Sequence, residues 1–131
     1  MIAAIVYPQD EFRLRLESSL GRCGVESESV STVSELKQLL AGRDVCLICC
    51  DEVVPDGDFQ SVLRVARQFA ARAPLVVLSH TCDWPGYLEM IHLGVFDLVA
   101  LPCPAAEMDR ILGNALLEYV SERALTQWAA A

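Results

Sequence analysis

The feature that most restricts the fold is an apolar stretch within residues 44–50, which ends at Asp51 and a Pro55-Asp56-Gly57 turn. A strand with no polar face is typical of the centre of a parallel sheet covered on both sides. In open α/β sheets, ligands bind just beyond the carboxyl ends of such strands. The Cys50-Asp51 end therefore marks the expected functional edge, and Asp51 is the first candidate site residue.

Strand-like and helix-like patterns alternate five times along the chain. Short apolar or alternating runs predict strands at residues 1–7, 25–30, 44–50, 75–79 and 96–101. Apolar residues at helical spacing predict helices at residues 10–21, 32–42, 59–73, 87–94 and 108–120. Because most of these strands are too buried for an antiparallel sheet, the pattern predicts one α/β domain: a doubly wound, five-stranded parallel sheet with helices on both faces.

Three helices carry more specific expectations. The spacing of Thr32 and Glu35 is that of a capping box. The helix after the fourth strand is expected to turn Tyr87, Leu88 and Ile91 inward, and the last helix to bury a stripe. That stripe consists of Met108, Ile111, Leu112, Ala115, Tyr119 and Val120.

Composition excludes several classes of function. The chain has 131 residues, of which 53% are hydrophobic, enough to build a core without disulfides or metal. Acidic residues outnumber basic ones by 18 to 10, and the basic residues are scattered, so direct nucleic-acid binding is not expected. There is no apolar run long enough to span a membrane and no signal-peptide layout, so we expect a cytoplasmic location.

The six cysteines fit buried, reduced thiols better than a disulfide framework. Cys46 and Cys49 have the spacing of a metal or redox motif, but residues three apart on a strand should face opposite sides. A second set lies near the carboxyl edge of the sheet and leaves a redox or metal sensor open, with zinc or a Cys82–Cys103 disulfide. Its members are Cys50, His80, Cys82 and Cys103.

The C-terminal segment contains no helix breaker. Residues 118–128 include no Gly or Pro and can continue the last helix past the core. Leu125 and Trp128 would then lack packing partners within one compact domain. We interpret residues 123–131 as a helical tail, which serves as the start of a linker to an output domain or as a dimer contact.

Taken together, these residues resemble the receiver domain of two-component response regulators over about residues 1–120. The resemblance rests on Asp51 with Pro55 and Gly57 after it, Val76-Val77-Leu78-Ser79, Gly94-Val95-Phe96-Asp97, and Pro102. It implies a flavodoxin-like sheet with strand order 2-1-3-4-5, a receiver-like domain at 1–122, and a cis bond before Pro102.

In receivers, the aspartate attacks a phosphoryl donor with the help of a magnesium ion. By resemblance, the metal is held by an acidic pair after the first strand, by Asp51 and by the carbonyl of Val53, while a lysine pairs with the phosphate. Here the acidic pair is replaced by Tyr7 and Pro8, and the lysine by Leu101. Leu98 replaces the aromatic switch residue, and Ser79 keeps the switch hydroxyl.

Neighbouring acidic residues have simpler roles than binding magnesium. Asp10 and Glu11 begin a helix, where acidic side chains are favoured. Glu52 should point to the side of the strand opposite Asp51. Asp56 and Asp58 lie in a turn that favours aspartate for its own backbone hydrogen bonds.

Two other residues have structural interpretations. His92 suits the carboxyl end of a helix. Trp84 is either a contact residue or a half-buried loop aromatic.

The sequence therefore predicts a degenerate receiver, or pseudo-receiver, in two-component or phosphorelay signalling. We expect no catalytic residue, no metal and no cofactor, with Asp51 an inactive phosphoacceptor position. Its partner would be another protein, an output domain or a second copy, bound through the fourth helix, fifth strand and fifth helix at about residues 87–119. Alternatives are a slow phosphoaccepting receiver that uses Asp51 with magnesium, and the sensor based on Cys50, Cys82 and Cys103. A small flavodoxin-like enzyme is not expected, because the sequence shows no phosphate-cradling glycine loop and no nucleophile with a partnered base.

Overall fold

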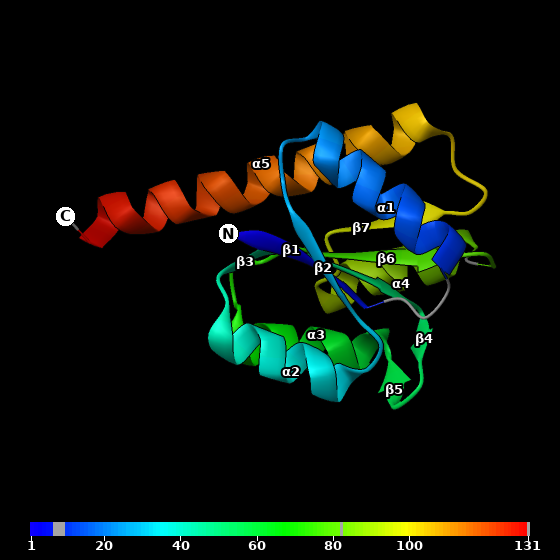
Figure 1. Ribbon diagram of the computed structural model, residues 1–131, viewed down its shortest axis with the longest axis horizontal. Coiled ribbons are helices and arrows are strands. Elements are labelled where there is room, and N and C mark those ends of the chain that lie inside the picture. The colour runs from blue at the N-terminus through cyan, green and yellow to red at the C-terminus, as the bar shows by residue number, and fades with distance from the viewer. Residues whose placement is uncertain (7–9, 82, 131) are drawn as a thin grey trace.

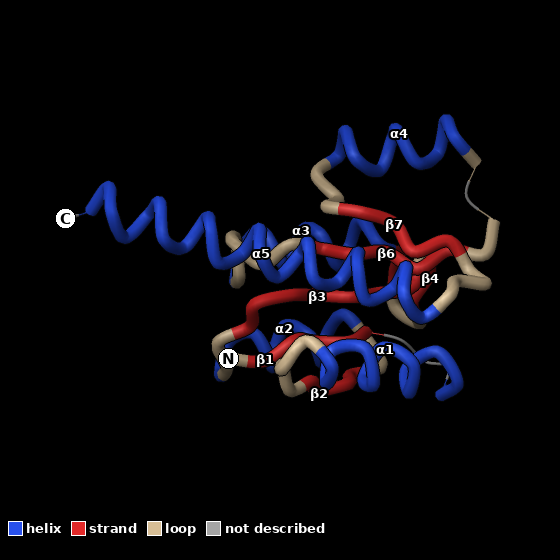
Figure 2. The backbone as a smooth tube through the Cα atoms, turned by 90° about the horizontal axis from the view of Figure 1, so that it is seen from above, coloured by secondary structure: helices blue, strands red, loops and turns tan. Residues whose placement is uncertain are grey.

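The computed structural model describes residues 1–6, 10–81 and 83–130. Its main sheet has five parallel strands in the order β2-β1-β3-β6-β7. The strands are β1 (Ile2–Val6), β2 (Ser27–Val30), β3 (Val45–Asp51), β6 (Leu75–Ser79) and β7 (Asp97–Ala100). Figure 2 shows them side by side in this order, with β3 in the centre. The predicted fold and strand order are confirmed.

Helices cover both faces of the sheet (Figure 1). On one face lie α1 (Asp10–Arg22) and α5 (Ala105–Ala130), and on the other lie α2 (Val33–Gly42), α3 (Phe59–Phe69) and α4 (Trp84–Leu93). A two-residue hairpin, β4 (Val53–Val54) with β5 (Gly57–Asp58), joins β3 to α3. The sequence predicted only a turn at this place.

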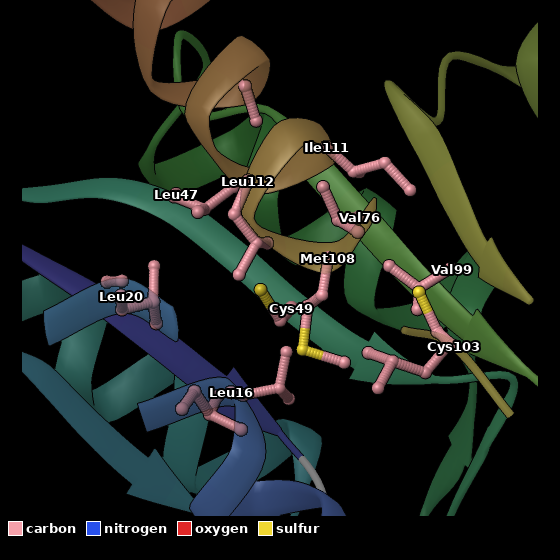
Figure 3. Packing of buried hydrophobic residues seen from close by; sticks show 14 of the residues in the cluster. Leu16, Leu20, Leu47, Cys49, Val76, Val99, Cys103, Met108, Ile111 and Leu112 are labelled. Atoms are coloured by element: carbon pink, nitrogen blue, oxygen red, sulfur yellow. The ribbon is translucent and has the colours of Figure 1, made fainter. Parts of the chain in front are cut away.

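Two hydrophobic clusters lie on opposite faces of the sheet. Because strand side chains alternate, Cys49 of β3 packs with α1 and α5, and Cys50 packs with α2 and α3. Figure 3 shows the first cluster, in which Leu112 and Met108 of α5 meet Leu16 of α1 over the sheet. Burying each large aliphatic side chain contributes about 1.5–3 kcal/mol to the stability of the fold.

Local signals at helix ends agree with the sequence at several positions. The Thr32 hydroxyl accepts the N–H of Glu35 at 3.1 Å, and the Glu35 carboxylate accepts the N–H of Ser31 at 2.8 Å. Gly94 ends α4 with φ +112°, a left-handed conformation that glycine adopts without strain. The expected cis bond between Leu101 and Pro102 is present.

Three packing predictions were wrong. The helix α3 ends at Phe69, where the chain turns at Ala70 to reach β6, so Ala73 packs into the core from a turn. In α4, Met90 is the buried side chain, while Leu88 and Ile91 are exposed and Tyr87 is half-buried. Val120 is exposed as well, although the preceding Tyr119 is buried, so the buried stripe of α5 ends at Tyr119.

The last helix continues far beyond the domain body. Figure 1 shows α5 projecting past the N-terminal end of the sheet. Leu125 is 65% and Trp128 82% exposed, as the sequence indicated. No helix in the described ranges is long and apolar enough to cross a bilayer.

Candidate functional site

The candidate site lies at the carboxyl edge of the sheet, where β3 and β6 end. In the register of these parallel strands, Asp51 lies opposite Leu78. The next position on β6 is Ser79, and the next position on β3 is Glu52. Paired positions on two adjacent parallel strands face the same side of the sheet. The register therefore places Glu52, and not Asp51, beside Ser79.

Asp51 is the final residue of β3 and is half-buried. One of its carboxylate oxygens, Oδ1, accepts the backbone N–H of Glu52 at 2.7 Å. This hydrogen bond fixes the carboxylate close to its own backbone at the strand end.

Glu52 contacts Ser79 directly, a contact that the sequence did not predict. The Ser79 hydroxyl donates a hydrogen bond to Oε1 of Glu52, and the Ser79 oxygen accepts the N–H of Thr81 at 3.2 Å. Glu52 directly follows β3, at the position that continues the strand register against Ser79. Its carbonyl also accepts the N–H of Phe59 at 2.9 Å, which holds the bend at this position.

The charges near Glu52 are mostly negative. Burial raises the pKa of the Glu52 carboxyl, the Asp51 charge raises it further, and His80 opposes both effects. A cavity of about 310 Å³ adjoins Glu52, and no lysine, arginine or histidine is among its described lining residues. These are Glu52, Phe59, Gln60, Thr81, Asp83, Gly86, Glu89 and Met90.

The positions expected to be degenerate fall into two groups. Tyr7 and Pro8 lie outside the described residues. Leu101 is buried in the cluster beneath α1 and α5, and its N–H donates to the Ser79 carbonyl at 2.8 Å. At the position where the resemblance expects a lysine, the chain therefore has an apolar side chain that packs in the core.

The acidic residues after Asp51 hold the local fold together. Asp56 accepts the N–H groups of Val33 and Ser34 at 2.8 and 3.2 Å, so it tethers the hairpin to the start of α2. These bonds lower the pKa of the Asp56 carboxyl. Asp58 caps α3 in a capping box with Ser61. Asp56 therefore bonds to a distant helix in addition to its own backbone.

A metal centre is not assembled from the described residues. They include no group of three or more His, Cys, Asp or Glu side chains placed to hold an ion. Glu11 is exposed on α1, and Val53 pairs with Asp58 in the hairpin. Magnesium binding, which the phosphoaccepting alternative needs, has no ready ligand set in this part of the chain.

The cysteine arrangement corrects two expectations. A bulge in the β1–β3 pairing at Cys46 places Cys46 and Cys49 in the same cluster, although the sequence placed them on opposite faces. Cys50 packs on the α2 and α3 face, and Cys103 packs on the α1 and α5 face, so the sheet separates them. Cys82 lies outside the described residues, and the other cysteines are free thiols. The sensor hypothesis loses the convergence of Cys50 and Cys103 on which it depended.

A second feature lies beside α4 and β7. Trp84 is 69% exposed and stacks on Tyr87 with 5.5 Å between ring centroids, so it is not a buried loop aromatic. These rings border a mostly apolar groove of about 370 Å³ whose floor includes Leu98 and Ala100. His92 is exposed in the last turn of α4, as expected from the helix dipole.

Comparison with known proteins points to one class of regulator. The chain is 29% identical over 106 residues to the transcriptional regulatory protein GltR of Pseudomonas aeruginosa. It is 25% identical over 114 residues to the response regulator protein PilR of the same organism, and 25% identical over 118 residues to the DNA-binding transcriptional regulator NtrC of Rhizobium meliloti. These matches cover 79%, 87% and 88% of the chain, but only 44%, 26% and 24% of the relatives. No family model matches the chain.

Solved structures share the fold at low sequence identity. The receiver domain of a LuxO repressor protein from Vibrio parahaemolyticus superposes with a TM-score of 0.82 at 14% identity, covering 95% of this chain and 98% of that one. The beryllofluoride-activated NtrC4 receiver domain dimer gives a TM-score of 0.80 at 17% identity, covering 91% and 99%. The chain has the receiver fold, and its relatives support a receiver domain of the response-regulator class used in two-component signalling.

Proposed function

We propose that the chain is a degenerate receiver, a signalling module that works through protein contacts without being phosphorylated. The observation that carries this proposal is the burial of Leu101 in the core at the position of the lysine. A phosphoryl group on Asp51 would bring about two negative charges. They would add to the neighbouring charge of Glu52, and the buried apolar side chain of Leu101 offers nothing to neutralise them.

The proposed contact surface is the face formed by α4, β7 and α5. The exposed Trp84, stacked on the half-buried Tyr87, and the groove beside Leu98 offer the kind of anchor that protein interfaces use. A second copy or an output domain is the proposed occupant. The residues from 123 onward are the proposed helical connection to an output domain. The proposed location of the protein is the cytoplasm.

Phosphorylation chemistry tests the proposal directly. The protein is incubated with acetyl phosphate and Mg²⁺, or with beryllofluoride, and followed by intact mass and by amide NMR around Asp51. We expect no mass shift and no amide changes. An active receiver domain treated in parallel shows that the reagents work, and full modification of Asp51 would contradict the proposal.

The alternative is a slow phosphoaccepting receiver. It is favoured by one observation: Asp51 remains partly exposed at the strand end. In that case magnesium would be required, and phosphate would accumulate over hours on the wild type and be absent from Asp51→Asn. Signalling lost in that variant, together with detectable phosphate on the wild type, would establish the alternative.

A further inference from the structure

The hydroxyl of Ser79 is a buried group with a defined partner. Ser79 is 2% exposed, and its oxygen accepts the N–H of Thr81. A serine hydroxyl carries one hydrogen to donate. In this structure that hydrogen is directed to Oε1 of Glu52.

This contact depends on the pairing of β3 with β6. Asp51 lies opposite Leu78, so Glu52 and Ser79 follow at matched positions on neighbouring strands. The N–H of Phe59 donates to the Glu52 carbonyl, and the N–H of Glu52 donates to the Asp51 carboxylate at 2.7 Å. These two hydrogen bonds to its backbone orient Glu52, whose side chain contacts the serine.

We propose that Glu52 is an internal ligand of Ser79. The Glu52 carboxylate accepts the hydroxyl hydrogen of Ser79 and holds the serine in one orientation without phosphorylation of Asp51. A phosphoryl oxygen would have to displace Glu52 to receive the same hydrogen. Charge opposes this exchange, because Asp51 and Glu52 are adjacent carboxylates. The inference rests on the proposed function, because it explains how a receiver that is not phosphorylated keeps a single state at this edge.

A double-mutant cycle tests the contact. The unfolding equilibrium constant is measured for wild type, Glu52→Ala, Ser79→Ala and the double variant. If the side chains interact, the effects are not additive, and we expect a coupling of about fivefold or more in the equilibrium constant. The matched control is Glu89→Ala, which removes another carboxylate from the same cavity and should be additive with Ser79→Ala.

NMR gives a readout that does not require Ser79→Ala to fold. The amide of Thr81 donates to the Ser79 oxygen, so its shift reports the orientation of the hydroxyl. We expect Glu52→Ala to shift this amide and Glu89→Ala to shift it less. An additive cycle, or an unchanged Thr81 amide in Glu52→Ala, would overturn the inference.

Beryllofluoride separates this inference from the proposed function. Modification of wild-type Asp51 would overturn the proposed function, while non-additivity at Glu52 and Ser79 would still support the internal contact. The reverse result, an unmodified Asp51 with additive variants, would overturn the contact and leave the proposed function standing.

Discussion

Arg22 of α1 and Asp109 of α5 form a two-pronged ion pair that joins the two helices on one face of the sheet. The Nε and Nη2 atoms of Arg22 lie 3.0 and 2.9 Å from the two carboxylate oxygens of Asp109. The hydroxyl of Ser19, a buried residue of α1, donates to the same carboxylate. This paired geometry fixes how α1 and α5 lie against each other.

The pair makes stability depend on pH in the acid range. Arg22 first and Ser19 second lower the pKa of the Asp109 carboxyl below its ordinary value. Its contribution to stability is therefore present above the unfolded pKa and is lost as pH falls through the lowered folded pKa. Thermal melts from pH 2 to 6 should show a shallower acid loss for Asp109→Asn than for wild type. The same slope in both proteins would contradict this linkage.

Leu112 should be among the most costly positions to truncate. It is fully buried between α5 and the sheet (Figure 3). Leu112→Ala should lower the free energy of unfolding by about 2–5 kcal/mol, because it leaves a cavity in a packed cluster. Leu117→Ala on the exposed side of the same helix serves as control and should change it by roughly 0.5 kcal/mol or less. Urea titration measures both.

Trp84 should matter for association and not for folding. It is mostly exposed, so Trp84→Ala should leave the melting temperature nearly unchanged. If the groove beside α4 is the contact surface, the variant should weaken self-association or partner binding by about tenfold or more, as interface aromatics do. Sedimentation of the full chain checks the dimer, and Trp128→Ala separates this surface from the helical tail. Unchanged association in Trp84→Ala would contradict the role of the groove.

The thiols of β3 should be inert in the folded protein. Burial raises the pKa of the Cys49 thiol to about 12 and that of Cys50 well above its ordinary value. Because the thiolate is the reactive form, neither should react with iodoacetamide at pH 8 until urea unfolds the chain. Peptide mapping locates the label, and partly exposed Cys23 is the internal control that should react first. Labelling of Cys49 or Cys50 in the native protein would support a thiol sensor.

The receiver-like architecture was readable from local patterns. Short apolar or alternating runs, separated by helical repeats, identified the five strands, and the carboxylate after the third run marked the edge at Asp51. Gly94 and the Thr32 cap marked helix ends because backbone geometry and capping are local properties. The helical tail followed from the lack of Gly or Pro in residues 118–128.

Other features depended on contacts between distant segments. The Glu52–Ser79 hydrogen bond needs the register of β3 against β6, which is not a property of either segment alone. The bulge that brings Cys46 and Cys49 to one face arises in the pairing with β1. Asp56 bonds across 23 residues to the start of α2. The sequence by itself determined the order of elements and the location of the candidate site, because periodicity and turn chemistry act locally. Only the tertiary structure decided which carboxylate meets the serine, because strand register and side-chain direction at strand ends are set by packing.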